Sequence, residues 1–295
     1  MGQRKTNLRK KTLGDYMILL VLTIMVLMIA VPFYMCVVVS FETSAAYAKN
    51  PASLWPSQFT LKNYDYLINT GSLLSGYENT LLLAGVGTAY AMVIMVCAAY
   101  AYSRPSFPGK KFLFIFILFT MFFGGGTVPK YLLMRSLKLT NSIWGVMLQG
   151  GVDAYYIIIM KNGFESTPPA LSEAATIDGA NDLQVFFHVM LPLQVPLLAT
   201  FSLFAAVGYW NAWYWPSLLL TRQGTQPLQL VLRSIANQAS TIEFQGSASG
   251  MATEDMFSQG MKMAAVVATM LPIMCVYPFL QKYFTKGVLV GSVKM

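Results

Sequence analysis

The sequence predicts an all-α protein that crosses a membrane several times. Of its 295 residues, 56% are hydrophobic and 11% are charged, whereas a soluble domain carries about 25% charged residues. The hydrophobic residues are concentrated in six runs that approach or exceed the roughly 20 apolar residues of a transmembrane helix and are too long for buried strands. The six predicted spans are Tyr16–Phe41, Asn79–Ser103, Phe112–Met134, Ile143–Met160, Leu193–Trp215 and Ala264–Phe284. We therefore expect one polytopic membrane domain over residues 1–295.

Charge and rare residues exclude several function classes. The net charge of +8 is typical of membrane topology and headgroup attraction. A nucleic-acid partner is disfavoured because no basic stripe alternates with aromatic residues on a soluble face. Cys36, Cys97 and Cys275 all lie in apolar runs, and His188 is the single histidine. We therefore expect no metal site and no catalytic pair, and the chain is predicted not to be an enzyme.

The first span sets the predicted orientation. Residues 1–15 hold five basic side chains before the first apolar run, and the positive-inside rule places such a segment in the cytoplasm. The run is much longer than the 7–15 apolar residues of a signal peptide, so an uncleaved helix is expected. Six crossings then return residues 285–295 to the cytoplasm of a bacterial inner (plasma) membrane. The basic residues near Lys130 oppose this rule on the outer side, so the orientation depends mostly on the first helix.

Two long outer segments, residues 42–78 and 216–263, are predicted to be periplasmic. Each contains one short amphipathic helix, over Leu61–Ile68 and over Pro227–Gln238, where Pro227 suits a first helical turn. Loops of this length are seldom mere connectors. The small residues of Ser247–Glu254 are expected to form a flexible tip.

A polar island, Ser172–Pro192, lies between the fourth and fifth spans in a predicted cytoplasmic loop over residues 161–192. Thr167 is expected to cap a short helix with Pro168 in its first turn. Gly179 should end that helix, because glycine accepts the left-handed conformation. A second helix, capped by Asn181 or Asp182, should run to the next span. The simplest interpretation is an interfacial helix pair that only joins two spans.

The spacing within this island favours a more specific interpretation. The string E-A-A-x3-G-x9-V-x-L-P occurs as Glu173, Ala174, Ala175, Gly179, Val189, Leu191 and Pro192. This string resembles the EAA loop of ABC-importer permeases, the inner-membrane components of binding-protein-dependent transport systems. The family usually has Ile where this chain has Val189. Ile177–Ala180 and the basic C-terminus resemble the carbohydrate-uptake, maltose-permease-like branch, closest to its oligo- and polysaccharide subgroup.

The resemblance implies a mechanism and a set of partners. The EAA helix would dock as a coupling helix on a dimer of cytoplasmic ATP-binding subunits, which bind the ATP and magnesium. A second homologous permease subunit would complete the pore, and a periplasmic or extracellular sugar-binding protein would deliver the substrate. Glu173, Ala174, Ala175 and Gly179 would form the contact and hinge, while Asp178 is expected to hold the loop by local hydrogen bonds.

Two stretches are candidates for a substrate path. Asp153 lies within the fourth predicted span, and a carboxylate there is a functional hypothesis by default. Gln149 should lie one turn earlier on the same helix face. The alternative is a hydrogen bond between helices. The aromatic stretch Tyr209–Ser217 contains the other candidates, which are Tyr209, Trp210, Asn211 and Trp213. That stretch forms either an interfacial aromatic belt or a surface on which sugars stack.

Outer basic residues including Lys130, Arg135 and Arg233 favour an acidic, uronate-type sugar, although acidic residues share that side.

Competing functions are less consistent with the sequence. No G-x4-G-K-[ST] phosphate loop occurs, and Gly124–Gly126 lacks a following Lys-Ser or Lys-Thr, so packing or hinging is expected there. The alternative is a stand-alone secondary transporter of a small solute, which predicts repeated halves and coupling carboxylates at mid-membrane.

Overall fold

The computed structural model describes residues 12–292 except for residues 70, 106, 223 and 250–256. The described chain is helical, and its single bridge of β type joins Glu42 to Phe59. The expected helical class is therefore confirmed. The elements are α1 (Leu13–Ser40), α2 (Ser44–Lys49), α3 (Lys62–Asn69), α4 (Ser72–Leu82), η1 (Leu83–Gly87), α5 (Thr88–Ser103), α6 (Lys110–Phe122), α7 (Thr127–Ser136), α8 (Ile143–Gly150), α9 (Ala154–Glu165), α10 (Pro169–Ile177), α11 (Asp182–Gln184), η2 (Val185–Met190), α12 (Leu191–Leu193), α13 (Val195–Trp210), α14 (Tyr214–Leu219), α15 (Leu228–Ser249) and α16 (Ser258–Ser292), where η marks a π-helix.

The chain forms two compact units. The first combines Met1–Leu67 with Asn237–Ala268, and the second combines Ile68–Ala236 with Thr269–Met295. The second unit contains all the predicted site residues. Part of the expected flexible tip, residues 250–254, lies outside the described residues.

In the first unit, α1 is a 28-residue apolar helix. Its first turn is closed by a capping box, in which the Asp15 carboxylate accepts from the Thr12 N–H at 2.7 Å. Pro32 lies inside the helix, which membrane helices tolerate. Most of its side chains are exposed along its length, as expected of a helix that faces lipid.

A buried polar cluster fixes the end of α1 to α3. The Asn63 side chain donates to the Ser40 carbonyl at 3.0 Å and to the Glu42 carbonyl at 3.2 Å. The Tyr64 hydroxyl lies 2.8 Å from Ser40 Oγ, and burial raises the pKa of this phenol. The amphipathic helix expected over Leu61–Ile68 is thereby confirmed, with one face packed on the chain that leaves α1.

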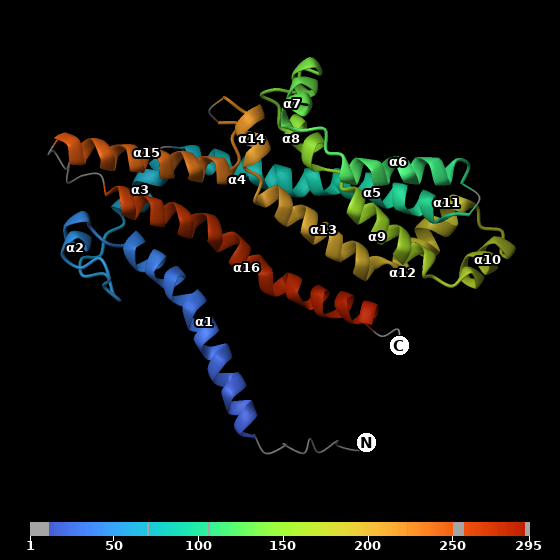
Figure 1. Ribbon diagram of the computed structural model, residues 1–295, viewed down its shortest axis with the longest axis horizontal. Helices are drawn as coiled ribbons and strands as arrows, with labels where there is room; N and C mark the ends of the chain where they lie inside the picture. The colour runs from blue at the N-terminus through green and yellow to red at the C-terminus, as the bar shows by residue number, and fades with distance from the viewer. Residues whose placement is uncertain (1–11, 70, 106, 223, 250–256, 293–295) are drawn as a thin grey trace. The chain divides into compact units, whose positions relative to one another are not determined.

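The core of the second unit is built where α5, α9 and α13 run side by side (Figure 1). Small residues permit the close approach, since Ala91 and Ala99 on α5 are fully buried and membrane helices associate through such close contacts. Met160 and Phe164 on α9 fill the space beside them. This packed bundle holds the candidate sites at its two ends.

Several expected spans are bent or broken. Among the described residues, Leu13–Ser40, Ser72–Ser103 and Ser258–Val276 are long and apolar enough to cross a membrane alone. Three bent pairs raise the number to six if each pair is one span: Lys110–Phe122 with Thr127–Ser136 (115°), Ile143–Gly150 with Ala154–Glu165 (54°), and Asp182–Leu193 with Val195–Trp210 (79°). The chain is therefore a membrane protein, and six crossings remain a prediction.

The prediction of one continuous helix over Phe112–Met134 is wrong. Gly125 and Gly126 have φ of +67° and +81°, a conformation that glycine adopts at little cost and that a helix cannot continue through. The Gly124–Gly126 stretch is thus the break between α6 and α7.

Pro196 explains the 79° bend between α12 and α13. Pro196 has no N–H to donate to a carbonyl four residues earlier, and Gln194 leaves the helical path with φ −96° and ψ 4°. The expected span beginning at Leu193 is therefore turned by 79° at its first residues.

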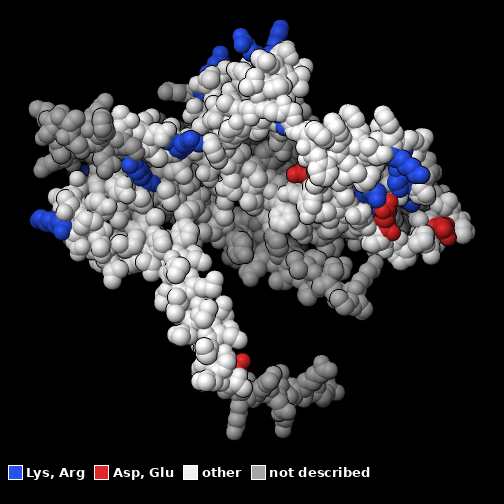
Figure 2. Space-filling model, in the orientation of Figure 1, with Lys and Arg blue, Asp and Glu red and all other residues white. Residues whose placement is uncertain are grey.

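Charged side chains of the second unit are gathered in a few groups. Figure 2 shows basic side chains around α7 and a mixed group near α10, with an isolated acidic side chain on the largely uncharged surface between them. This distribution matches a unit whose middle lies in hydrocarbon, where charged side chains are costly.

Candidate functional site

The polar island forms a compact helix–turn–helix at one end of the second unit (Figure 1). Gly179, with φ +89°, ends α10 in a Schellman motif. In this motif the Ala180 N–H donates to the Ala175 carbonyl at 2.9 Å, and the Gly179 N–H donates to the Thr176 carbonyl at 3.0 Å. No atom lies within 4 Å of a Cβ built at Gly179. The expected helix end is confirmed, and its requirement for glycine is purely conformational.

The second half of the island begins with a capping box. Asn181 Oδ1 accepts from the Gln184 N–H at 2.9 Å, and Gln184 Oε1 accepts from the Asn181 N–H at 2.8 Å. Asn181 is therefore the cap, one of the two alternatives expected. The helical path then continues through α11, η2 and α12, with a π-helical middle. Such π segments are frequent at functional sites.

Two expectations about hydrogen bonding in this loop are wrong. The Asp178 carboxylate makes no hydrogen bond to the described residues, and only its N–H does, to the Ala174 carbonyl at 2.9 Å. The backbone and the Asn181 box already hold the turn. Thr167 does not cap α10, whose N-cap is Pro168. Instead Gln194, at the bend before α13, donates to Thr167 Oγ1 at 3.0 Å and to the Gly163 carbonyl at 2.8 Å.

One face of α10 is exposed and the other is packed. Glu173 and Ala174 are exposed, and Ile177 is 86% exposed. Ala175 packs against the core of the unit. A groove of about 460 Å³ runs beside the helix, lined by Arg104, Ser172, Glu173, Thr176, Ile177, Asp182 and Val185. The loop thus presents a carboxylate, a small residue and an apolar side chain on one accessible surface.

Aromatic side chains connect this loop to the helices of the core. Phe186, on η2, lies 4.5 Å from the ring of Tyr100 on α5, and Tyr100 lies 5.7 Å from Phe164 on α9. The Arg104 guanidinium lies 4.5 Å above the Tyr100 ring and donates to its hydroxyl. Displacement of α10 is therefore expected to act on α5 and α9 through η2, which α10 contacts, since close-packed contacts transmit strain. Sequence reasoning missed Arg104, whose only signal was its position between a span and Pro105.

The second candidate region lies at the break between α8 and α9. Asp153 is not in the middle of a helix as expected but is the N-cap of α9, where Oδ1 accepts from the Tyr155 N–H at 2.8 Å. Gln149 belongs to α8, across a 54° bend, so the expected shared face is wrong. The helix breaks at Gly151, where a Cβ would lie 2.7 Å from the Met147 carbonyl oxygen.

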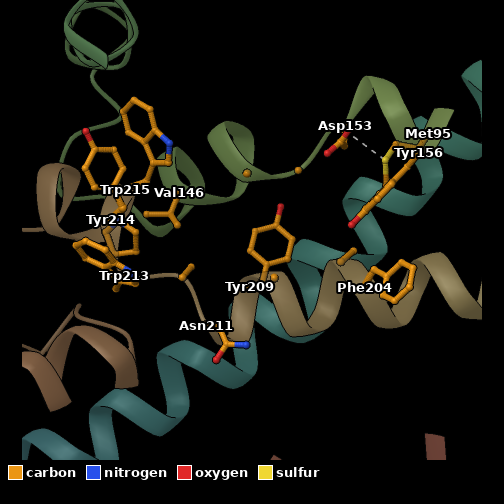
Figure 3. Close-up of a pocket in the computed structure, with 16 residues that line it drawn as sticks. Met95, Val146, Asp153, Tyr156, Phe204, Tyr209, Asn211, Trp213, Tyr214 and Trp215 are labelled. Carbon is orange, nitrogen blue, oxygen red and sulfur yellow. Dashed lines mark hydrogen bonds between the residues drawn. The ribbon is translucent and has the colours of Figure 1, made fainter. Parts of the chain in front are cut away.

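Figure 3 shows the cavity beside this break, with Asp153 on one side and Asn211 and Trp213 on the other. Its volume is about 370 Å³. It is lined by Met95, Val146, Gly150, Gly151, Asp153, Tyr156, Phe204, Ala205, Gly208, Tyr209, Asn211, Ala212, Trp213, Tyr214, Trp215 and Pro216. Cavities of this size with many aromatic and few polar groups are typical ligand sites.

The aromatic stretch Tyr209–Ser217 is not one helix, and its tryptophan side chains lie in different surroundings. The helix α13 ends at Trp210, and α14 begins at Tyr214. Trp210 does not line the cavity and is buried, with its indole N–H unpaired among the described residues. Trp213, in contrast, is 43% exposed and lines the cavity. Gln149 does not line the cavity either.

Tyr209 is chiefly a packing residue. Its ring lies 2.9 Å from the position of a Cβ at Gly87, and its hydroxyl lies 2.9 Å from that of a Cβ at Gly151. The hydroxyl donates to the Met147 carbonyl at 2.8 Å. Gly87 on η1 and Gly151 at the α8–α9 break therefore form the slot that accepts this ring, and the hydroxyl bonds a carbonyl near the end of α8.

Metal and disulfide chemistry find no support among the described residues. Within the part of the chain that the structure covers, no three His, Cys, Asp or Glu side chains gather as a metal site. Cys36, Cys97 and Cys275 are free.

Known proteins resemble this chain over most of its length. The family described as binding-protein-dependent transport system inner membrane component matches residues 73–290. YtcP of Bacillus subtilis (strain 168), a polygalacturonan/rhamnogalacturonan transport system permease protein, is 36% identical over 285 residues, which are 97% of this chain and 99% of the relative. Protein LplC of the same organism is 36% identical over 263 residues, or 89% of this chain and 88% of the relative. The crystal structure of a bacterial ABC transporter involved in the import of the acidic polysaccharide alginate contains a chain with TM-score 0.84 and 30% identity, covering 94% of this chain and 99% of that one.

Proposed function

This chain belongs to the family of binding-protein-dependent transport system inner membrane components, and from that premise we propose that it is one of two permease subunits of an ATP-driven importer. ATP hydrolysis is done by a separate dimer of ATP-binding subunits, because this chain has no phosphate-binding loop. A second, homologous permease completes the pore, and an outer sugar-binding protein delivers the substrate. The chain itself binds no nucleotide, magnesium ion or nucleic acid.

The geometry of α10 is the observation that carries this proposal. Glu173, Ala174 and Ile177 form an accessible surface on a helix whose end is fixed by Gly179. A basic side chain of the ATPase would pair with Glu173, and Ala174 would allow close approach. Because η2 connects α10 to the aromatic contacts on α5 and α9, closure of the ATPase dimer would move these pore helices.

The substrate is proposed to be an oligo- or polysaccharide of the acidic, uronate type. The support is chemical similarity to relatives whose names include polygalacturonan, rhamnogalacturonan and alginate. Asp153, Asn211 and Trp213 are the proposed contacts in the cavity of Figure 3, since hydroxyl groups pair with carboxylate and amide, and sugar faces stack on aromatic rings. Tyr209 shapes the same wall. Gln149 and Trp210, the other predicted contacts, do not line this cavity.

The proposed orientation places both termini and the α10 end in the cytoplasm of a bacterial inner membrane. The mixed charges near α10 then meet the ATPase, and the basic residues of α7 lie on the outer side. Cysteine accessibility to a membrane-impermeant reagent tests this orientation. Ser172→Cys should react only from the inside and Ser136→Cys only from the outside, and the reverse pattern would contradict it.

The coupling function is tested by purifying the complex in detergent and measuring ATPase activity. Glu173→Lys should lose the ATPase subunit or the stimulation of its activity by the loaded binding protein. Lys111→Glu, an exposed charge reversal near the same end that does not line the groove, is the matched control and should behave as the wild type. If the wild type purifies without an ATPase and still transports solute, the alternative of a stand-alone secondary transporter replaces this proposal.

A further inference from the structure

A second cavity lies on another side of the Asp153 region. Its volume is about 750 Å³. It is lined by Thr120, Met121, Phe123, Gly124, Gly125, Pro129, Lys130, Leu133, Val152, Asp153, Ala154 and Tyr155. These residues come from the two broken helix pairs, α6 with α7 and α8 with α9, so both breaks open onto one space.

The breaks leave non-helical backbone facing this space. Non-helical backbone at membrane depth is tolerated only where it is buried in protein or lines a water-filled cavity. Gly125, at φ +67°, lines the cavity, as does the chain at Val152 and Asp153. In other transporters, paired discontinuous helices mark the place where substrate binds.

Lys130 is the single cation among the lining residues. It is half-buried, and no carboxylate of the described residues forms an ion pair with it. Asp153 shares the cavity but directs Oδ1 to the Tyr155 N–H. A cation that faces a cavity without a counter-ion from the described residues can pair with an anionic oxygen group from outside this chain.

We propose that Lys130 is the residue of the translocation path that binds the carboxylate of a uronate, and this inference rests on the proposed function. The other lining groups suit the rest of such a sugar. The second oxygen of Asp153 and the Thr120 hydroxyl accept from sugar hydroxyls, and the exposed rings of Phe123 and Tyr155 offer faces for stacking. Lys130 thus determines specificity, because the neighbouring Asp153 would repel an acidic sugar that had no cation to bind.

A lipid phosphate is the competing source of the same anionic oxygens, since lysines near helix ends reach toward headgroups. The two sources predict different ligand dependence. A uronate should protect Lys130 in bilayers without anionic lipid, whereas a phosphate would protect it without any sugar.

The first experiment measures lysine reactivity in the complete importer. The importer is reconstituted with its partner permease, ATPase subunits and binding protein in phosphatidylcholine vesicles, with or without phosphatidylglycerol. An amine-acetylating reagent is applied with trigalacturonate or its methyl ester, and labelling is quantified by peptide mass. We expect trigalacturonate, and not the ester, to protect Lys130, with Lys138 as the exposed reference on the same segment. Equal protection by both sugars, no protection, or protection that follows phosphatidylglycerol alone would overturn the proposal.

The second experiment measures uptake. Lys130→Gln should lower kcat/KM for trigalacturonate by about 10-fold or more, the loss expected for a charge-assisted bond, and leave the ester nearly unchanged. Lys130→Arg should retain most activity. Arg135→Gln, an exposed basic residue of α7 outside the cavity, is the matched control. An equal loss for both sugars in Lys130→Gln sinks this inference alone. A wild-type importer whose ATPase responds to no sugar sinks the proposed function instead, and with it this inference.

Discussion

Replacing Gly179 with alanine tests whether the end of α10 sets the strength of ATPase docking. Gly179 has φ +89° and no atom within 4 Å of a built Cβ. Steric contact therefore contributes nothing, and the whole cost is that of a left-handed conformation, about 1–2 kcal/mol for a residue with a Cβ. If the Schellman turn must form for docking, that cost appears in the binding equilibrium. Since about 1.4 kcal/mol is a factor of ten, the Kd for the ATPase subunit should rise roughly 5- to 30-fold.

Two further substitutions at the same position set the order of effects. Gly179→Asn should weaken docking less than alanine, because asparagine tolerates the left-handed region better. Gly179→Pro should be the most severe, because it fixes φ near −65° and removes the N–H that bonds the Thr176 carbonyl. The order asparagine, alanine, proline is specific to a conformational cause.

The assay is titration of the purified permease pair with fluorescent ATPase subunit. Gly109→Ala is the matched control, because Gly109 also has positive φ, +73°, and open space around its Cβ, but it begins α6 outside the docking surface. It should lose similar folding stability and keep its affinity for the ATPase. The reasoning is refuted if Gly179→Ala binds within twofold of the wild type, or if Gly109→Ala weakens binding equally.

Three smaller predictions concern the contacts that support the sites. Tyr209→Phe removes the bond to the Met147 carbonyl and should lower the free energy of unfolding in detergent by about 1 kcal/mol, measured by thermal melting; no change would show that water replaces this bond. Gln194→Leu removes both bonds that join the bend to the loop at Thr167, so ATP hydrolysis should continue while transport per ATP falls, and unchanged coupling would contradict this. Glu165→Gln breaks the ion pairs of Glu165 with Lys110, at 3.2 Å, and with Lys161, at 2.6 Å. Because the Glu165 side chain is 36% exposed, the free energy of unfolding should change by less than about 1 kcal/mol. A larger loss in the same melting assay would refute that estimate.

Local chemistry made the polar island predictable. Gly179 ends its helix as the sequence predicted, and Asn181 is one of the two predicted caps of the next helix, because both features depend on a few adjacent residues. The roles of Asp178 and Thr167 were mispredicted for the opposite reason. At Asp178, backbone hydrogen bonds and the Asn181 capping box already hold the turn, so the carboxylate is not needed. Thr167 instead accepts a hydrogen bond from Gln194, which is 27 residues away in the sequence.

The breaks in the apolar runs were not predictable from the same kind of pattern. Two adjacent glycines in a membrane helix are as consistent with close packing as with a break, since small residues are common at helix interfaces. The face shared by Gln149 and Asp153 was inferred from helical periodicity, which fails once the helix bends between them. Lys130 appeared to be an ordinary outer-loop lysine for the same reason, because the α6–α7 break that brings it to the cavity is invisible in hydropathy.

A break exposes backbone N–H and carbonyl groups, and it is stable only where distant groups form hydrogen bonds with them. Asn141, in the loop before α8, shows how distant groups satisfy exposed backbone. Its Oδ1 accepts from the N–H groups of Thr221 and Arg222, at 2.8 Å and 3.1 Å, and its own N–H donates to the Leu219 carbonyl at 2.7 Å. These bonds join segments about 80 residues apart, so the partners of this backbone cannot be found from the local sequence. The free energy of each break therefore depends on tertiary partners, and the cavities that the breaks create are properties of the assembled bundle rather than of any single run of sequence.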